Sequence, residues 1–157
     1  MTLEGLQTEL QDLINQVVTF NRVAGNSIIV YFFGEPGDDG VVSVFIDPSW
    51  RYQKNGKIVL GSYDLLIEED DFNSKGEYED RFEYLCSLTD SIKGSKLIRC
   101  SVDLESSDIT MEFSGSQILR NFANSAFDDK HWTYRNRPKQ LTACAAPIGV
   151  TLREEKK

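Results

Sequence analysis

The chain has 157 residues, of which 40% are hydrophobic, 27% are charged and 11% are aromatic. This length and composition allow one buried core without a disulfide or metal, which excludes a disordered protein and predicts a single domain over residues 1–157. The formal net charge of −8 argues against a nucleic-acid-binding protein, because an acidic chain repels phosphates.

The compartment is predicted from targeting signals and cysteines. Residues 1–6 lack the basic and apolar segments of a signal peptide, and no stretch is apolar for long enough to span a membrane. The cysteines Cys86, Cys100 and Cys144 are odd in number and far apart, which favours a reducing compartment. We therefore expect a cytoplasmic protein with no membrane association.

The first half of the chain begins with a periodic apolar segment. Its three- and four-residue steps predict an amphipathic helix over residues 2–19, which the segment 21–26 should end. The β-branched and aromatic run 28–33 predicts a strand covered on both faces. Across the glycine-rich loop 34–40, the run 41–46 is expected to return as its hairpin partner.

A second hairpin is predicted around Asn55-Gly56, because both central residues of the favoured two-residue turn need a positive φ. Its strands should cover residues 49–53 and 57–60. Residues 65–67 are expected to extend the same sheet.

The second half opens with Ser74 and Glu77, whose spacing matches a capping box. They predict a helix over residues 75–92, closed by Gly94. In the half-buried strand predicted after it, one set of alternating residues should share a face: Ile98, Cys100, Val102 and Leu104.

The remaining strands are predicted over 109–113, 117–123, 141–144 and 148–152, before a charged tail. Together these elements predict an α+β fold. We expect an antiparallel sheet of about six to nine strands with two amphipathic helices packed on it.

Two segments share the pattern Asp-x-x-Trp-x-Tyr, from Asp47 to Tyr52 and from Asp129 to Tyr134. Each follows a helix and a hairpin-like stretch, which suggests an internal repeat of residues 2–64 in residues 75–152. The alternative is two unrelated strands that each carry aromatic residues on one face.

The aromatic residues of this pattern stand two apart, so each pair shares one face of a strand. These residues are Trp50, Tyr52, Trp132 and Tyr134. Core packing is the favoured interpretation. The alternative is an aromatic pocket between the halves, in a module that binds a small molecule or a peptide.

The acidity is local. Ten acids and two bases lie between Asp64 and Asp90, which accounts for the whole net charge, while 15 acids balance 15 bases elsewhere. We expect a negative surface that attracts a basic protein partner. Its candidate contact residues are Glu68, Glu69, Asp70, Asp71, Glu77, Asp80 and Glu83. The alternative is a solvated loop followed by a helix start that favours acids.

A basic group surrounds the second Trp-x-Tyr: Lys130, Arg135, Arg137 and Lys139. Bases interleaved with aromatic residues can bind single-stranded nucleic acid. The acidity of the whole chain argues against that interpretation here.

No catalytic site is predicted. The only histidine, His131, is expected in an exposed position, and phosphate-binding glycine loops and the zinc-protease motif are absent. A zinc site would need His131 and all three cysteines, and the acidic run 68–71 lacks the spacing of a calcium loop. We therefore expect no enzyme, no metal and no cofactor.

A resemblance adds a function to this description. The segment 108–119, followed by 129–134, resembles a strand–turn–strand and Trp pattern of small bacterial proteins grouped with immunity proteins of polymorphic and contact-dependent toxin systems; residues 50–60 resemble the same element. The resemblance implies a non-catalytic inhibitor that binds a cognate toxin, for example a nuclease with a basic groove. These families share no catalytic residues, so the resemblance assigns no site residue.

Overall fold

The computed structural model describes residues 1–126 and 130–153. The strands of this part are β1 (Val18–Ala24), β2 (Ser27–Phe32), β3 (Val42–Ile46), β4 (Trp50–Lys54), β5 (Lys57–Gly61), β6 (Leu97–Val102), β7 (Ile109–Phe113), β8 (Gln117–Asn121), β9 (Trp132–Asn136), β10 (Leu141–Ala146) and β11 (Gly149–Arg153). The helices are α1 (Leu3–Gln11) and α2 (Lys75–Ser87), with short 3-10 turns η1 (Ser62–Leu65), η2 (Glu69–Asp71) and η3 (Asp90–Ile92).

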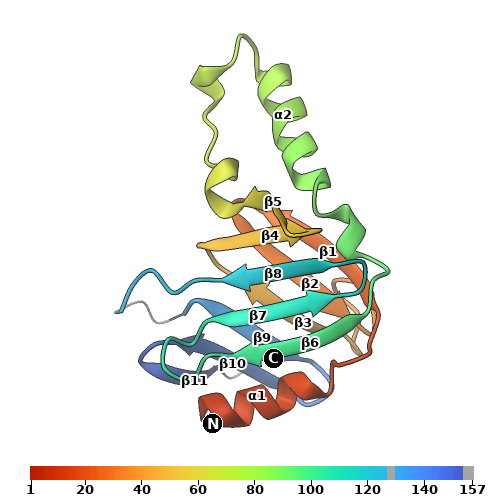
Figure 1. Cartoon of the computed structure of the whole chain (residues 1–157), viewed down its shortest axis with the longest axis vertical. Coiled ribbons are helices and arrows are strands. Elements are labelled where there is room, and N and C mark those ends of the chain that lie inside the picture. Colours follow the sequence, from red (N-terminus) through yellow and green to blue (C-terminus); the bar gives the residue numbers. More distant parts are fainter. Residues whose placement is uncertain (127–129, 154–157) are drawn as a thin grey trace.

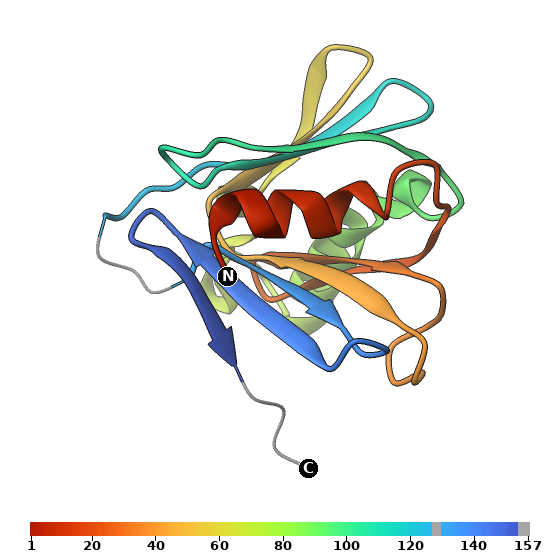
Figure 2. The same cartoon turned by 90° about the horizontal axis from the view of Figure 1, so that it is seen from below.

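The strands form two antiparallel sheets, in the orders β1-β2-β3-β9-β10-β11 and β5-β4-β8-β7-β6. Figure 1 and Figure 2 show the sheets facing each other as two layers. α1 lies across one end of this sandwich beside β6, whereas α2 and the segment before it project from the opposite end, beyond β5 (Figure 1). No helix in the described residues is long and apolar enough to cross a membrane.

This architecture confirms the predicted α+β class, with antiparallel pairing and two helices. The strands divide between two sheets instead of forming the single sheet expected. Two sheets form because the apolar face of each sheet must be covered by another layer. Helices of 9 and 13 residues cannot cover a sheet of this width, so the second sheet supplies the opposing layer.

The N-terminal helix is shorter than predicted. α1 ends at Gln11, Asn15 turns the chain with a φ of 68°, and the predicted end of the helix lies in β1. The segment 21–26, expected as a loop, also belongs mostly to β1, which pairs with β2 from Val18 onward. The helical spacing of Val17 and Val18 was therefore coincidental, since these β-branched residues favour a strand.

The second helix is also shorter than the predicted 75–92. α2 ends at Ser87, and the chain continues through η3 to Gly94, whose φ is 83°. Residues 65–67 do not extend the sheet, because Leu65 lies in η1.

Both predicted hairpins of the first half are confirmed. β2 pairs with β3 and is buried at every residue. β4 pairs with β5 across Asn55 and Gly56, whose φ angles of 51° and 75° fit the predicted turn.

The alternation predicted for the strand after Gly94 is interrupted. The β6–β7 register shifts between Leu97 and Arg99, so Ile98 points outward and is 50% exposed, while Leu97 is fully buried. A bulge inserts an extra residue and thereby reverses the facing of the residues before it. Cys100 and Val102 remain on the buried face as expected, whereas Leu104 lies beyond the end of β6 and is 50% exposed.

The two halves of the chain exchange strands between the sheets. β1–β3 belong to one sheet and β4–β5 to the other, while β6–β8 and β9–β11 show the reverse arrangement. As a result, β9 pairs with β3, and β4 pairs with β8. In both pairs the last residue of the third strand stands opposite a tryptophan: Ile46 opposite Trp132, and Asn121 opposite Trp50.

The tryptophans also make equivalent hydrogen bonds. Trp50 Nε1–H donates to the carbonyl oxygen of Asn26, in the β1–β2 turn, at 2.8 Å. Trp132 Nε1–H donates to the carbonyl oxygen of Ser107, in the β6–β7 connection, at 2.7 Å. The two Trp-x-Tyr segments thus occupy equivalent places in the fold. A duplication in sequence stays a prediction, and Asp129 of the second pattern lies outside the described residues.

Candidate partner-binding surface

The projecting segment, residues 62–88, carries nine acids and two bases. We call it the acidic arm. All seven predicted contact residues lie on it and are exposed: Glu68, Glu69, Asp70, Asp71, Glu77, Asp80 and Glu83. The acids therefore gather on one projection, which Figure 1 shows extending away from the sheets.

Hydrogen bonds at the start of α2 fix the junction between this helix and the preceding part of the arm. Ser74 Oγ accepts a hydrogen bond from the Glu77 backbone N–H at 3.2 Å, and Glu77 Oε2 accepts one from the Asn73 N–H at 3.1 Å. The predicted cap is therefore present, with the glutamate reaching one residue further back than in the standard capping box. The first bond satisfies one of the N–H groups that a helix start leaves without a partner, and the second ties the residue before the cap to the first turn.

Aromatic contacts join α2 to the segment that precedes it. The rings of Phe72 and Tyr78 meet edge to face at 5.9 Å, and those of Tyr78 and Phe82 stack at 6.4 Å. Leu85 is the one residue of α2 that is buried. The arm thus rests on a thin apolar layer and leaves most of its surface to solvent.

Large apolar side chains are exposed among the acids of the arm. Tyr63 is 66%, Leu66 57% and Tyr84 54% exposed. Tyr84 stands four residues after Asp80 and seven after Glu77, so all three lie on one side of α2. Sequence reasoning missed these three apolar residues, because only the projection of the arm reveals that they are uncovered.

A hollow of about 290 Å³ lies where α2 meets β5 and η1. Its lining includes Leu60, Ile67, Arg81 and Tyr84, and the Arg81 guanidinium lies 5.3 Å from the centre of the Tyr84 ring. Aromatic residues beside a hollow, with a polar rim, are typical of the energetic centre of a protein–protein interface.

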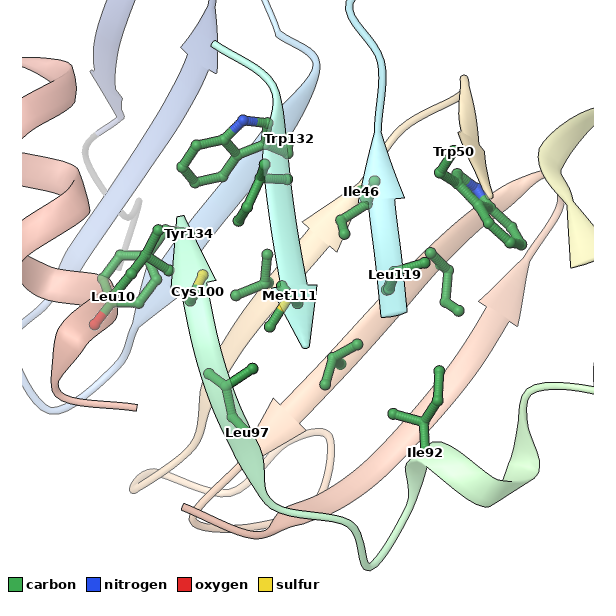
Figure 3. Packing of buried hydrophobic residues seen from close by; sticks show 14 of the residues in the cluster. Leu10, Ile46, Trp50, Ile92, Leu97, Cys100, Met111, Leu119, Trp132 and Tyr134 are labelled. Atoms are coloured by element: carbon green, nitrogen blue, oxygen red, sulfur yellow. The ribbon is translucent and has the colours of Figure 1, made fainter. Parts of the chain in front are cut away.

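The four predicted pocket residues lie elsewhere. Trp50, Tyr52, Trp132 and Tyr134 are at most 2% exposed and belong to the core between the sheets. Figure 3 shows the two tryptophans on opposite sides of Ile46 and Leu119. These four side chains pack the core, and none of them lines the hollow where α2 meets β5 and η1.

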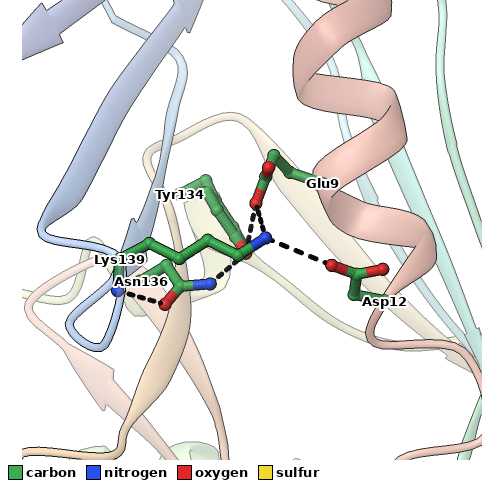
Figure 4. Close-up of polar contacts among 5 residues, drawn as sticks. All are labelled: Glu9, Asp12, Tyr134, Asn136 and Lys139. Atoms are coloured by element: carbon green, nitrogen blue, oxygen red, sulfur yellow. Dashed lines mark hydrogen bonds and ion pairs between the residues drawn. The ribbon is translucent and has the colours of Figure 1, made fainter.

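The tyrosine hydroxyls link each half to the helical segment of the other. Tyr52 O–H donates to Gln117 Oε1 at 2.6 Å and lies 2.9 Å from Ser91 Oγ, in η3. Tyr134 receives a hydrogen bond from Asn136 at 2.9 Å and donates to Glu9 of α1 at 3.5 Å (Figure 4). Burial raises the pKa of both tyrosines, so both hydroxyls stay protonated at neutral pH.

Lys139 does not lie with the other members of the basic group predicted from the sequence. Its Nζ lies 2.7 Å from Glu9 Oε2 and 3.2 Å from Asp12 Oδ2, at the end of α1 (Figure 4). Hydrogen bonds to these carboxylates raise the pKa of Lys139. Its role is to tie the β9–β10 connection to α1.

His131 is buried, at 2% exposed, which corrects the exposed position expected for it. Neither ring nitrogen has a hydrogen-bond partner in the described structure. Nearby, Asp47 accepts a hydrogen bond from Ser27 at 3.3 Å and pairs with Lys130 at 3.5 Å. Burial is the largest influence on the Asp47 carboxyl and raises its pKa, against the opposing effect of Lys130.

The cysteines Cys86, Cys100 and Cys144 are free thiols. Cys100 is buried, and burial raises its pKa to about 12. Within residues 1–126 and 130–153, no three histidine, cysteine or acidic side chains are placed to hold a metal ion.

Comparison of the chain with protein-family models, curated proteins and solved structures gives no match.

Proposed function

We propose that this chain is a non-catalytic, immunity-type protein that binds and neutralises a basic protein toxin through the acidic arm. The observation that carries the proposal is the gathering of exposed acids and exposed apolar side chains on one projecting segment. A surface of this kind attracts a basic partner over a distance and then offers apolar contacts for tight binding.

The charges of the arm act mainly on the rate and selectivity of binding. Exposed charges add little to affinity singly, but together they speed encounter with a partner of opposite charge. A toxin that acts on phosphate-containing substrates has a basic groove, which this arm would fill and thereby close to substrate.

The exposed apolar side chains of the arm act mainly on affinity. Tyr63, Leu66 and Tyr84 expose apolar surface that a partner could remove from water. Aromatic side chains of this type often supply most of the binding free energy of an interface. The binding site is therefore expected to centre on Tyr84, with the acids around it.

The test uses the purified product of the gene next to the one that encodes this chain, since inhibitor and toxin genes of such systems lie together. Binding would be measured by calorimetry at about 50 and 300 mM salt. We expect tight one-to-one binding that weakens with salt, and survival of cells that express both proteins where the partner alone is toxic.

The double variant E69K/D70K should weaken this binding at least about tenfold at low salt and reduce its salt dependence. The matched control D39K/E105K changes the net charge by the same amount at exposed positions of the sandwich, and should keep nearly wild-type affinity. Equal losses in both variants would show that net charge matters but the arm does not. No loss in either would overturn the assignment of this surface.

A further inference from the structure

The outer face of the six-stranded sheet holds a hollow of about 430 Å³. At its β1 edge, Arg22 also borders a smaller hollow that Glu83 of α2 helps to line. The described lining of the larger hollow contains five cationic side chains and no carboxylate: Arg22, Lys130, Arg135, Arg137 and Arg153. We call it the basic hollow. It collects a third of the bases that lie outside the acidic segment, on a chain whose net charge is −8.

The lining residues that belong to strands stand in two adjacent rows of the strand register, and these rows cross all six strands. One row runs through Phe20, Tyr31, Ser43, Arg135, Thr142 and Arg153. The other runs through Arg22, Ile29, Phe45, Thr133, Cys144 and Thr151. In both rows the large apolar side chains stand on β1–β3, whereas hydroxyls and arginines dominate on β9–β11.

The apolar side is preformed. Ile29 and Tyr31 are 5% and 7% exposed, and the rings of Phe20 and Tyr31 meet edge to face at 5.8 Å. Together with Val41 they form a small apolar cluster on the outer side of the sheet, separate from the main core. A flat apolar group could therefore lie against this floor without any rearrangement of the sheet.

The cationic side is only partly neutralised. Lys130 pairs with Asp47 and lies 5.2 Å from the centre of the Phe45 ring. Arg137 uses one terminal nitrogen to hold the carbonyl oxygens of Gly37 and Asp38, at 2.6 and 3.2 Å. Arg22 and Arg153 form no ion pair with the carboxylates of the described residues. Clustered cations repel each other, so an anion bound among them would be favoured.

We propose that the basic hollow binds a planar aromatic anion, with its ring on Ile29, Tyr31 and Phe45 and its phosphate, carboxylate or sulfonate toward β9–β11. Its volume lies in the range of small-ligand sites, which combine an apolar floor with a few placed polar groups. Arginines suit the anionic end, because the guanidinium fork matches the oxygens of phosphates and carboxylates. This site does not depend on the proposed toxin-binding function.

The test uses the fluorescent probe 1-anilinonaphthalene-8-sulfonate and its uncharged analogue N-phenyl-1-naphthylamine, titrated into the full chain. We expect saturable one-to-one binding of the sulfonate probe and at least about tenfold weaker binding of the uncharged analogue. Methyl NMR should show the largest shifts at Ile29 and Val41. Inorganic phosphate should displace the probe only weakly, since it lacks the ring.

The variant R22Q/R153Q removes two exposed cations of the hollow and should weaken sulfonate binding about tenfold. R99Q/R120Q, on the outer face of the other sheet, is the matched control and should leave it unchanged. Equal binding of the charged and uncharged probes, equal losses in both variants, or shifts elsewhere would overturn the proposal. So would self-association that competes with the probe, because the hollow would then hold the acidic arm of a second copy.

Discussion

The acidic arm and the basic hollow carry opposite charges, and they are built on different parts of the fold. The arm projects from the sandwich and rests on a thin apolar layer in which Leu85 is the buried residue of α2. The hollow lies on a six-stranded sheet whose other face packs into the main core through Trp132 and Tyr134. A projection offers a large surface to a macromolecule, whereas a concave site on a rigid sheet encloses a small ligand.

The two regions also differ in how their charged residues are distributed along the chain. The arm's charge is continuous in sequence, so counting acids locates it. The hollow's cations come from β1, β9, β11 and the connections beside them, and only strand pairing brings them together.

The largest expected effect concerns the core beneath the hollow. Trp132→Ala removes a fully buried ring and its hydrogen bond to Ser107, and should lower the free energy of unfolding by about 3–5 kcal/mol. Urea denaturation followed by circular dichroism measures this. Leu104→Ala, at a half-exposed position, is the control and should cost far less. A small effect of Trp132→Ala would mean that the sheet does not depend on this core.

The next effect contrasts a thiol of the acidic arm with a thiol of the sandwich core. Cys86 of α2 is half-buried, and burial with the nearby Asp90 and Glu83 raises its pKa, while burial raises that of Cys100 to about 12. Because the thiolate is the reactive form, both should react more slowly than a free thiol at pH 8 and faster as the pH rises above 9.

We expect Cys86 to react with a disulfide reagent at least about a hundredfold faster than Cys100, whose sulfur the reagent reaches only when the sandwich opens. Mass spectrometry of the labelled peptides against time measures both rates, and C86A should remove the fast phase. Equal rates at the two sites would show that the thiol of the arm is no more accessible than the thiol in the core of the sandwich.

The smallest of these effects is local. Leu85→Ala should destabilise the arm by about 2 kcal/mol, because it empties part of the layer under α2. Hydrogen exchange should speed up in residues 75–87 while the strands keep their protection. Ile58→Ala, an exposed neighbour on β5, is the control. Faster exchange throughout the strands would show that arm and sandwich unfold as one unit.

Local signals predicted much of the fold. The Asn55-Gly56 turn, the buried β2 and the cap at Ser74 depend on a few neighbouring residues, and the structure confirms each. The missed features depend on distant contacts. Pairing with β2 turns the expected end of the first helix into β1, and the bulge at Ile98 appears only when β6 meets β7.

The candidate sites divide in the same way. The acids of the arm were identified from sequence, but the uncovered Tyr63, Leu66 and Tyr84 were not, because apolar residues in a sequence do not reveal whether another element covers them. Part of the basic group near Trp132 was noticed, yet Arg22 and Arg153 join it only across five strand pairings.

By itself, the sequence determined the α+β class, the main hairpins and the place of the negative charge, because these follow from residue type and short-range spacing. The tertiary structure alone decided that the strands form two sheets, that the acids project on an arm and that separate cations converge over an apolar floor. These features arise from pairing between residues far apart in the chain, which local propensity does not encode.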